Sequence, residues 1–236
     1  MADEVFDQLS GHIVRGDLGC DEALPAERSL SDQLGVNRQA IREALQRLAQ
    51  AGLVDVHHGG VTRVRDYRRT AGLDLLPRLL AGVDGTPDPS VIRSVMELRA
   101  TLGPDIAARC AERATSATIE RLADAWAALQ EAPGSDPIAR ATADLDYWEA
   151  LVDGADNVAY RLAFNSLRAV YEPVIPQLAP VLADEVGDLT DHEAIVVAVK
   201  AGDPPAAQDA AWALLARGTE AIIRLLGALD GAPETS

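Results

Sequence analysis

Helical segments separated by glycine and proline fill the sequence from residue 90 onward, and this pattern restricts the fold more than any other feature. Apolar residues recur there at helical spacing. The segments span residues 90–114, 117–131, 137–153, 157–178, 184–201 and 204–229. The breaks between them contain Pro133, Gly134, Gly187, Gly202, Pro204 and Pro205. Because this part of the sequence has no strand-like alternation, nucleotide-binding loop or internal repeat, we predict an all-α bundle of six or seven helices.

The composition excludes several other classes of protein. Of the 236 residues, 48% are hydrophobic and 4% are aromatic, which indicates a packed core built on aliphatic side chains. No apolar run approaches the ~18–20 residues of a membrane helix, and acidic residues rather than a secretion signal follow Met1. Cys20 and Cys110 stand far apart, which indicates neither a disulfide framework nor a zinc site. We therefore expect a soluble cytoplasmic protein.

The charge of the chain is unevenly distributed. The net charge is −16, yet residues 28–69 carry 8 arginines against 4 acidic residues. A basic segment within an acidic protein can bind a polyanion, because the local field matters more than the total charge. A nucleic acid therefore remains a possible partner.

The N-terminal part predicts three short helices followed by a β-hairpin. The helical segments cover residues 3–16, 25–34 and 38–51, and a glycine follows or ends each of them. Apolar strands at 53–57 and 61–65 flank a Gly59-Gly60 turn. This layout, three helices plus a β-hairpin wing, is typical of a winged helix-turn-helix.

Changes in composition suggest three parts of the chain. We place the winged helix-turn-helix domain at residues 1–70 and the helical domain at residues 90–236. Residues 71–89 are expected to form a linker with a short helix, because leucines are followed by a polar stretch with Gly and Pro. The predicted fold class is therefore mainly α.

The third helix carries residues suited to reading DNA bases. Its apolar residues recur at i, i+4 and i+7 and should face inward: Ile41, Leu45 and Leu48. Arg38, Gln39 and Arg42 should then face outward. In a major groove, arginine pairs with guanine and glutamine with adenine. The alternative is an ordinary solvated helix face, and the combination of helix, turn and wing favours DNA binding.

A long motif in this domain resembles that of a known family. The run LPAERSLSDQLGVNRQAIREALQRLAQAGLVDVHHGGVTRV is similar to the DNA-binding domain of the GntR superfamily of bacterial transcription regulators. The segment HHGGVTRVRDYRRTAGLDLLPRLL, which overlaps the end of this run, resembles the wing and linker of the FadR subfamily. The resemblance implies the following DNA-contacting residues: Arg28 on phosphate, then Asn37, Arg38, Gln39 and Arg42 on the helix, and His58 and Gly59 in the wing. FadR-like wings often carry lysine next, where this sequence has Gly60.

The helical domain resembles the effector-binding domain of the same subfamily. The segments VMELRATLGPDIAARCAERAT and DLDYWEALVDGADNVAYRLAFNSLRAVYEP carry this resemblance. Most relatives with the so-called FCD domain bind a metal through one Asp and three His. Here Asp144 stands at the Asp position, Trp148 at the first His and His192 at the second, and no histidine follows. Because two protein ligands are too few for a tight zinc site, we expect no metal and no other cofactor.

The resemblance to the metal-free FadR type implies an acidic effector, a fatty acid or acyl-CoA, held between helices. The residues expected around it are Arg99, Trp148, Asn165, Tyr171 and Trp212. A smaller organic acid in the same pocket is the second possibility. Alternatively, the tryptophans are core residues alone, and Arg99 pairs with Asp144 in a purely structural contact.

Together these patterns predict a DNA-binding transcription regulator rather than an enzyme. The family implies a homodimer that reads a palindromic operator with half-sites about one helical turn apart. A helical enzyme or a ligand-storage protein is the alternative from another class. It has little support, because no Ser-His-Asp, Cys-His or paired-carboxylate arrangement stands out, and Cys110 lies in an Ala-rich helix where a thiol is buried and inert.

Overall fold

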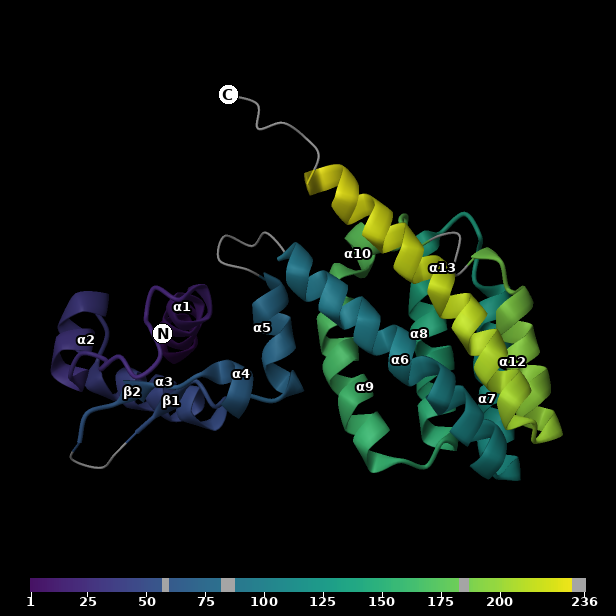
Figure 1. The fold of residues 1–236 in the computed structure, drawn as a ribbon, viewed down its shortest axis with the longest axis horizontal. Coiled ribbons are helices and arrows are strands. Elements are labelled where there is room, and N and C mark those ends of the chain that lie inside the picture. Colours follow the sequence, from purple (N-terminus) through teal and green to yellow (C-terminus); the bar gives the residue numbers. More distant parts are fainter. Residues whose placement is uncertain (57–59, 82–87, 183–186, 231–236) are drawn as a thin grey trace. The chain divides into compact units, whose positions relative to one another are not determined.

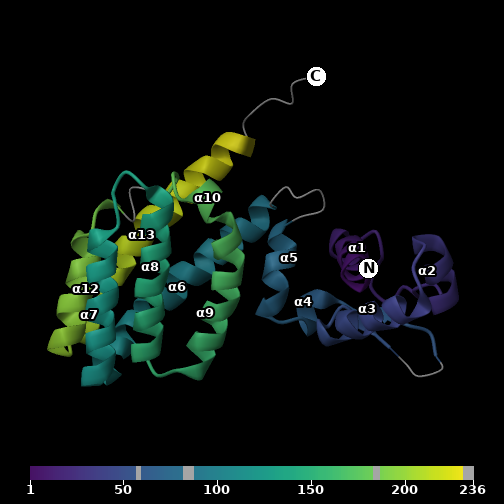
Figure 2. The same ribbon diagram turned by 180° about the vertical axis from the view of Figure 1, so that it is seen from behind.

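A computed structural model describes residues 1–56, 60–81, 88–182 and 187–230. The chain divides into two compact units, Met1–Asp88 and Pro89–Ser236, which appear in Figure 1 and, from behind, in Figure 2. Each unit has an apolar core of its own. Within the residues described, no helix combines the length and the apolar character needed to cross a membrane.

The N-terminal unit contains the predicted helices and hairpin (Figure 1). The helices are α1 (Ala2–Arg15), α2 (Glu27–Leu34) and α3 (Arg38–Gln50). Strands β1 (Val54–Asp55) and β2 (Arg63–Val64) pair antiparallel in the register Val54↔Val64 and Asp55↔Arg63. They are followed by α4 (Tyr67–Thr70), the 3-10 helix η1 (Leu73–Leu75) and α5 (Leu76–Ala81). The mainly helical fold class with a winged helix-turn-helix is thus confirmed, and the strands are shorter than predicted.

One apolar core holds α1, α3 and the hairpin together. Apolar residues three or four positions apart supply one buried face of each helix. The buried residues are Val5, Phe6, Leu9, Ile13, Leu24, Leu30, Ile41, Ala44, Leu45, Leu48, Leu53, Val54, Val64 and Leu75. Leu79 packs against this core as well. The first part of the segment that we expected to be a linker therefore belongs to the N-terminal unit.

Gly52 allows the chain to turn sharply between α3 and β1. Its φ is 73°, in the left-handed region that favours glycine. A Cβ at this position would lie 2.5 Å from the Thr70 carbonyl oxygen. Thr70 Oγ1 in turn donates a hydrogen bond to the Gly52 carbonyl at 2.6 Å. This close approach fixes α4 against the end of α3.

Two guanidinium groups lie over the ring of Phe6 on α1. Arg47 of α3 is 4.8 Å from the ring centroid and Arg78 of α5 is 3.8 Å from it. Each arginine also forms an ion pair with α1, Arg47 with Asp3 and Arg78 with Asp7. A cation–π contact contributes roughly 0.5–1 kcal/mol when exposed and more when desolvated. These contacts fasten α3 and α5 to the same helix.

The C-terminal unit is helical throughout the part of it that the structure describes. Its elements are α6 (Pro89–Arg113), α7 (Ser116–Glu131), α8 (Pro137–Gly154), α9 (Val158–Tyr171), η2 (Glu172–Val174), α10 (Ile175–Leu178), α12 (Thr190–Ala201) and α13 (Pro204–Asp230). The predicted segment 157–178 is divided into α9, η2 and α10, because Pro173 and Pro176 lack the N–H that a continuous helix needs. The other boundaries lie close to those predicted.

Helices α6 and α13 pack along each other (Figure 1), and α12 and α8 also contact α6. Two glycines on the inner faces permit the tightest contacts between helices. A Cβ at Gly103 of α6 would overlap Leu215 of α13, and a Cβ at Gly154 of α8 would overlap the Cys110 Sγ of α6. Both regions belong to a large core that extends over α6, α7, α8, α12 and α13. These helices therefore approach each other without room for an added methyl group.

We expect the substitution Gly154→Ala to destabilise the C-terminal unit by about 1–3 kcal/mol, since overpacking a close-packed core forces neighbouring atoms apart. Cys110→Ala in the same chain should return most of that loss, because it removes the overlapping sulfur. All three tryptophans lie in this unit, so tryptophan fluorescence during urea unfolding reports on it alone. If Gly154→Ala costs the same stability with and without Cys110→Ala, the proposed contact between positions 110 and 154 is contradicted.

Candidate nucleic-acid interface and effector site

The turn between α2 and α3 is built from local hydrogen bonds. Gly35 ends α2 with a φ of 66°, and Ser31 Oγ donates to the Val36 carbonyl at 2.6 Å. Asn37 caps α3, its Oδ1 accepting from the Ala40 N–H at 2.9 Å. Such a cap satisfies one of the free N–H groups at the start of a helix. The turn therefore sets the direction in which α3 leaves it.

The outer face of α3 is polar and exposed. Arg38, Gln39 and Arg42 are exposed, while Ile41, Leu45 and Leu48 on the opposite face are buried. Arg28 on α2 and the cap Asn37 are exposed too. The five residues on or beside these two helices that the resemblance assigns to DNA contact are thus exposed to solvent, and their contact with DNA stays a prediction.

Arg42 is engaged by a carboxylate across the turn. Its Nε donates to Glu27 Oε2 at 2.8 Å, and both side chains are largely solvent-exposed. A surface pair of this kind is worth only ~0–1 kcal/mol, so a phosphate or a base edge can displace the carboxylate. Glu27 orients Arg42 in the absence of DNA. Sequence reasoning missed this residue, although the PAER motif contains it.

The tip of the wing lies outside the described residues. His58 and Gly59, the two wing residues implied by the resemblance, belong to that segment. At the base of the hairpin, Arg63 Nη1 donates to the Asp21 carbonyl at 2.6 Å. Leu24 N–H donates to the Thr62 carbonyl at 2.9 Å. The loop before α2 therefore holds the base of the wing.

A buried pair lies in the C-terminal unit, at two of the positions that the sequence resemblance compared with metal ligands. His192 Nε2 of α12 is 2.8 Å from Asp144 Oδ1 of α8, and both side chains are buried. The Tyr147 hydroxyl donates to the His192 carbonyl at 3.0 Å, and the Trp126 ring is stacked with the imidazole at 6.4 Å. The histidine is thus held on several sides by α7 and α8. The complete burial of His192 was not predicted from the sequence.

The residues present do not fit a metal ion. Asp144 and His192 use the atoms facing each other for their own contact, and Trp148 occupies the position of the first histidine ligand. Among the residues that the structure describes, no group of three His, Cys, Asp or Glu side chains is placed to hold a metal. Structural and catalytic zinc sites use three or four protein ligands.

Burial governs the titration of two groups near this pair. It raises the pKa of Tyr147 well above its usual value, and the Asp144 carboxylate and Cys110 raise it further. Burial also raises the pKa of the Cys110 thiol to about 12. Since the thiolate is the nucleophilic form, Cys110 is chemically inert at neutral pH. The buried polar groups of the bundle therefore offer no activated nucleophile here.

The five predicted effector residues occupy different environments. Trp148 is buried, with its ring edge-on to Tyr147 at 6.3 Å, and Tyr171 packs half-buried against the core. Arg99 is half-buried on α6. Asn165 and Trp212 lie on the surface, and 66% of Trp212 is exposed. The structure therefore does not bring all five side chains together around one interior site.

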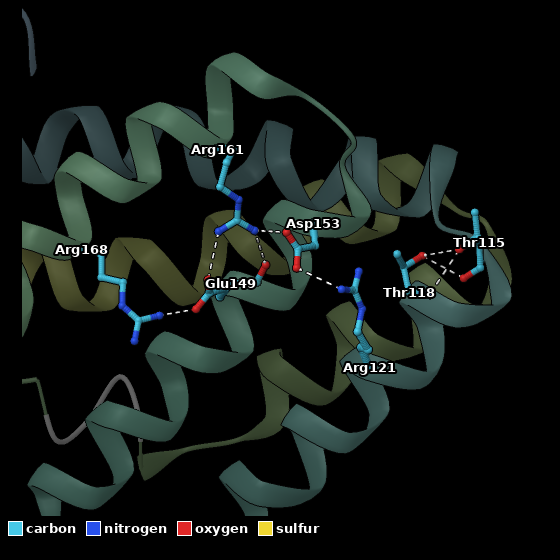
Figure 3. Close-up of polar contacts among 7 residues, drawn as sticks. All are labelled: Thr115, Thr118, Arg121, Glu149, Asp153, Arg161 and Arg168. Carbon is cyan, nitrogen blue, oxygen red and sulfur yellow. Dashed lines mark hydrogen bonds and ion pairs between the residues drawn. The ribbon is translucent and has the colours of Figure 1, made fainter.

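An ion-pair network fastens α9 to α8 (Figure 3). Arg161 contacts Asp153 and Glu149, with its Nη1 at 3.2 Å from Glu149 Oε1. Arg168 also contacts Glu149. On the other side, Arg121 of α7 lies 3.4 Å from Asp153, and Thr115 caps α7 by accepting from the Thr118 N–H (Figure 3). These arginines serve to hold helices together.

A carboxylate that precedes α12 contacts the first residue of the helix. Asp188 Oδ1 accepts a hydrogen bond from the Thr190 N–H at 3.0 Å. The hydrogen bonds from Thr190 lower the pKa of the Asp188 carboxyl below its usual value.

Both units match family models. Residues 1–64 match the model of bacterial regulatory proteins of the gntR family, and residues 94–217 match the FCD domain. The chain belongs to the GntR family. It is a DNA-binding transcription regulator with an FCD effector-binding domain, and it is not an enzyme.

Relatives of this GntR-family regulator cover most of its length. The HTH-type transcriptional regulator Mce2R of Mycobacterium tuberculosis is 42% identical over 224 residues, 95% of this chain and 92% of the relative. A fatty acid metabolism regulator protein of Edwardsiella ictaluri is 37% identical over 153 residues, 64% of this chain and 61% of the relative. A solved structure of Streptococcus agalactiae GntR has the same fold, with a TM-score of 0.50, 22% identity and coverage of 93% and 99%.

We expect Asn37→Ala to weaken the start of α3, because the Ala40 N–H loses its acceptor. Loss of such a cap costs roughly 0.5–2 kcal/mol. Amide hydrogen exchange at Ala40 and its neighbours should accelerate, and the N-terminal unit should unfold at a lower temperature. Asn165→Ala, at an exposed position within α9, is the matched control and should change neither. Unchanged exchange at Ala40 would show that the cap does not stabilise α3.

Proposed function

We propose that this regulator binds a palindromic operator as a homodimer and that an acidic small molecule, a fatty acid or an acyl-CoA, controls the binding. The observation that carries the proposal is the exposed set Arg38, Gln39 and Arg42 at the amino end of α3, opposite a fully packed face. We place its action in the cytoplasm, where the bacterial chromosome lies.

The amino end of α3 is chemically suited to DNA. The free N–H groups and the dipole of a helix N-terminus attract phosphate, and arginine and glutamine there can reach base edges. Arg28 on α2 is exposed and supplies a further cation for the DNA backbone. The remainder of the chain is strongly acidic, so DNA is repelled from it and directed to this face.

The way in which a helix-turn-helix binds DNA is the reason to propose a dimer. One helix in a major groove contacts only a few base pairs, and helix-turn-helix proteins gain specificity by placing two such helices ~34–36 Å apart on a symmetric site. An effector changes operator affinity when it binds one spacing of the two helices better than the other, a coupling of typically ~1–3 kcal/mol. The effector class is supported by relatives that are named fatty acid metabolism regulators.

We expect Arg38→Ala and Arg42→Ala each to weaken binding to the operator by roughly 1–3 kcal/mol and to relax base preference at one position of each half-site. Fluorescence anisotropy with DNA from upstream of the regulator's own gene measures this. Arg121→Ala in the FCD domain removes the same charge and should leave DNA affinity unchanged. Wild-type affinity in both α3 variants would overturn the assignment of α3 as the reading helix.

Replacing Arg28 tests the phosphate contact separately. We expect Arg28→Ala to weaken binding to all DNA sequences alike and to reduce the slope of log K against log salt by about 1, because one fewer phosphate is neutralised. The same titration on the Arg38→Ala variant supplies the comparison. A loss of sequence preference without a change in the slope would assign Arg28 to a base instead.

A further inference from the structure

A strongly basic stretch of chain leads from the wing into α4. We call residues 63–69, which include β2 and α4 up to Arg69, the β2–α4 segment. It has one acidic residue, Asp66, against four arginines, all of them exposed: Arg63, Arg65, Arg68 and Arg69. The chain as a whole has a net charge of −16, so a local excess of positive charge on its surface is a candidate contact for a polyanion.

Strand β2 directs two of these arginines to solvent. Side chains alternate along a strand, so Arg63 and Arg65 lie on the face opposite to the buried Val64. Asp55 lies directly across the sheet from Arg63 and offsets part of its charge. Arg65 instead lies across from an apolar residue, because its N–H donates to the Leu53 carbonyl at 2.8 Å. Within the described residues, no carboxylate forms an ion pair with Arg65.

Helix α4 adds two arginines whose charge is also largely available. Arg69 Nε lies 3.6 Å from Asp66 Oδ2, yet 86% of the Arg69 side chain is exposed. A pair this exposed is worth ~0–1 kcal/mol, so a phosphate can replace the carboxylate. The Arg68 guanidinium lies 5.9 Å from the Tyr67 ring centroid, and no ion pair holds it in the part of the chain that the structure describes.

The β2–α4 segment has a fixed place in the N-terminal unit, at the carboxyl end of α3. Thr70, the residue after the segment, donates to the Gly52 carbonyl at 2.6 Å, and Figure 1 shows α4 on the side of α3 away from α2. The 13 residues of α3 rise ~1.5 Å each, which puts this end ~20 Å from Arg38. The arginines of the segment are therefore too distant to contact the same base pairs as Arg38.

We infer that the β2–α4 segment is a second DNA-contacting surface, in which Arg65, Arg68 and Arg69 bind backbone phosphates beside the base pairs that α3 contacts. The inference rests on the proposed function, since it extends the operator contact of α3. Four residue steps span at most ~14 Å, and each DNA strand carries a phosphate per ~3.4 Å of helix axis, so each arginine can meet its own phosphate. Such contacts fix the orientation of a protein on DNA without selecting a sequence.

The test compares the full-length wild type with a triple variant, Arg65→Gln, Arg68→Gln and Arg69→Gln. Arg63 is kept, because it holds the loop before α2. Fluorescence anisotropy is measured on DNA from upstream of the regulator's own gene and on a random sequence of equal length. The triple variant should bind both about tenfold more weakly and lower the slope of log K against log salt by about 1 for each lost phosphate contact. Its base preference should be that of the wild type.

A second triple variant controls for total charge. Arg93→Gln, Arg121→Gln and Arg224→Gln change three exposed arginines of the C-terminal unit and remove the same charge. This variant should keep the wild-type affinity and salt slope. If the first triple variant does not fold, by its far-UV circular dichroism, Arg65→Gln alone replaces it and should lower the slope by about 1.

Ethylation interference on the operator locates the contact. Ethylation removes the charge of a phosphate, so wild-type binding should weaken when a contacted phosphate is modified. The first triple variant should become insensitive to ethylation at the phosphates that its arginines no longer contact. It should remain sensitive at phosphates that Arg28 and the start of α3 contact.

Any of four results would overturn the inference. They are wild-type affinity and slope in the first triple variant, an equal loss in the control variant, an ethylation pattern identical to that of the wild type, or an altered base preference with an unchanged slope. The last result would assign the segment a structural role in supporting α3. Each of these leaves the proposed function intact, whereas a wild-type protein that binds operator and random DNA equally rejects the proposed function itself.

Discussion

The burial of one face of α3 is the constraint on which the DNA-binding unit depends. Ile41 and Leu48 have no exposed surface, and Leu45 is nearly as well covered by α1 and the hairpin. A helix anchored in this way can rotate neither about its axis nor out of the core without exposing these side chains, at a cost of about 1.5–3 kcal/mol each. The opposite face, with Arg38, Gln39 and Arg42, must consequently point to solvent. The orientation of this proposed DNA-contacting face thus follows from the packing of the opposite face of α3.

Close packing also determines the position of side chains in the C-terminal unit. Gly103 and Gly154 let α6 approach α13 and α8 closely, and the core that results leaves little freedom for Asp144, Trp148 and His192. Within this core Asp144 and His192 form a buried hydrogen-bonded pair.

Helix α5 is packed into the N-terminal unit. Arg78 of α5 and Arg47 of α3 both engage Phe6 and the acidic face of α1. Leu75 of η1 is buried in the same core, and Leu79 of α5 packs against it. Helices η1 and α5, which lie in the segment that the sequence predicted to be a linker, are therefore part of the packed N-terminal unit.

The helices of both units were predictable from sequence, because apolar spacing and helix-ending glycines are local signals. The identity of the DNA-binding unit was predictable too, since the PAER and recognition-helix motif is contiguous. The side chains around the effector were not. Trp212 and Asn165 were expected beside the effector and lie on the surface, because the rotation of a helix about its axis cannot be inferred where apolar residues occupy several of its faces. Glu27 was missed because its significance comes from a partner distant in the sequence, Arg42.

Native mass spectrometry of the protein purified from its own host, recorded with and without operator DNA, tests the central claim most directly. The account predicts a dimer that carries a small acidic molecule in the absence of DNA, and a DNA-bound dimer in which the occupancy of that molecule is changed. A monomer on DNA, or a dimer whose small-molecule content is the same in both states, would contradict an effector-controlled dimeric regulator.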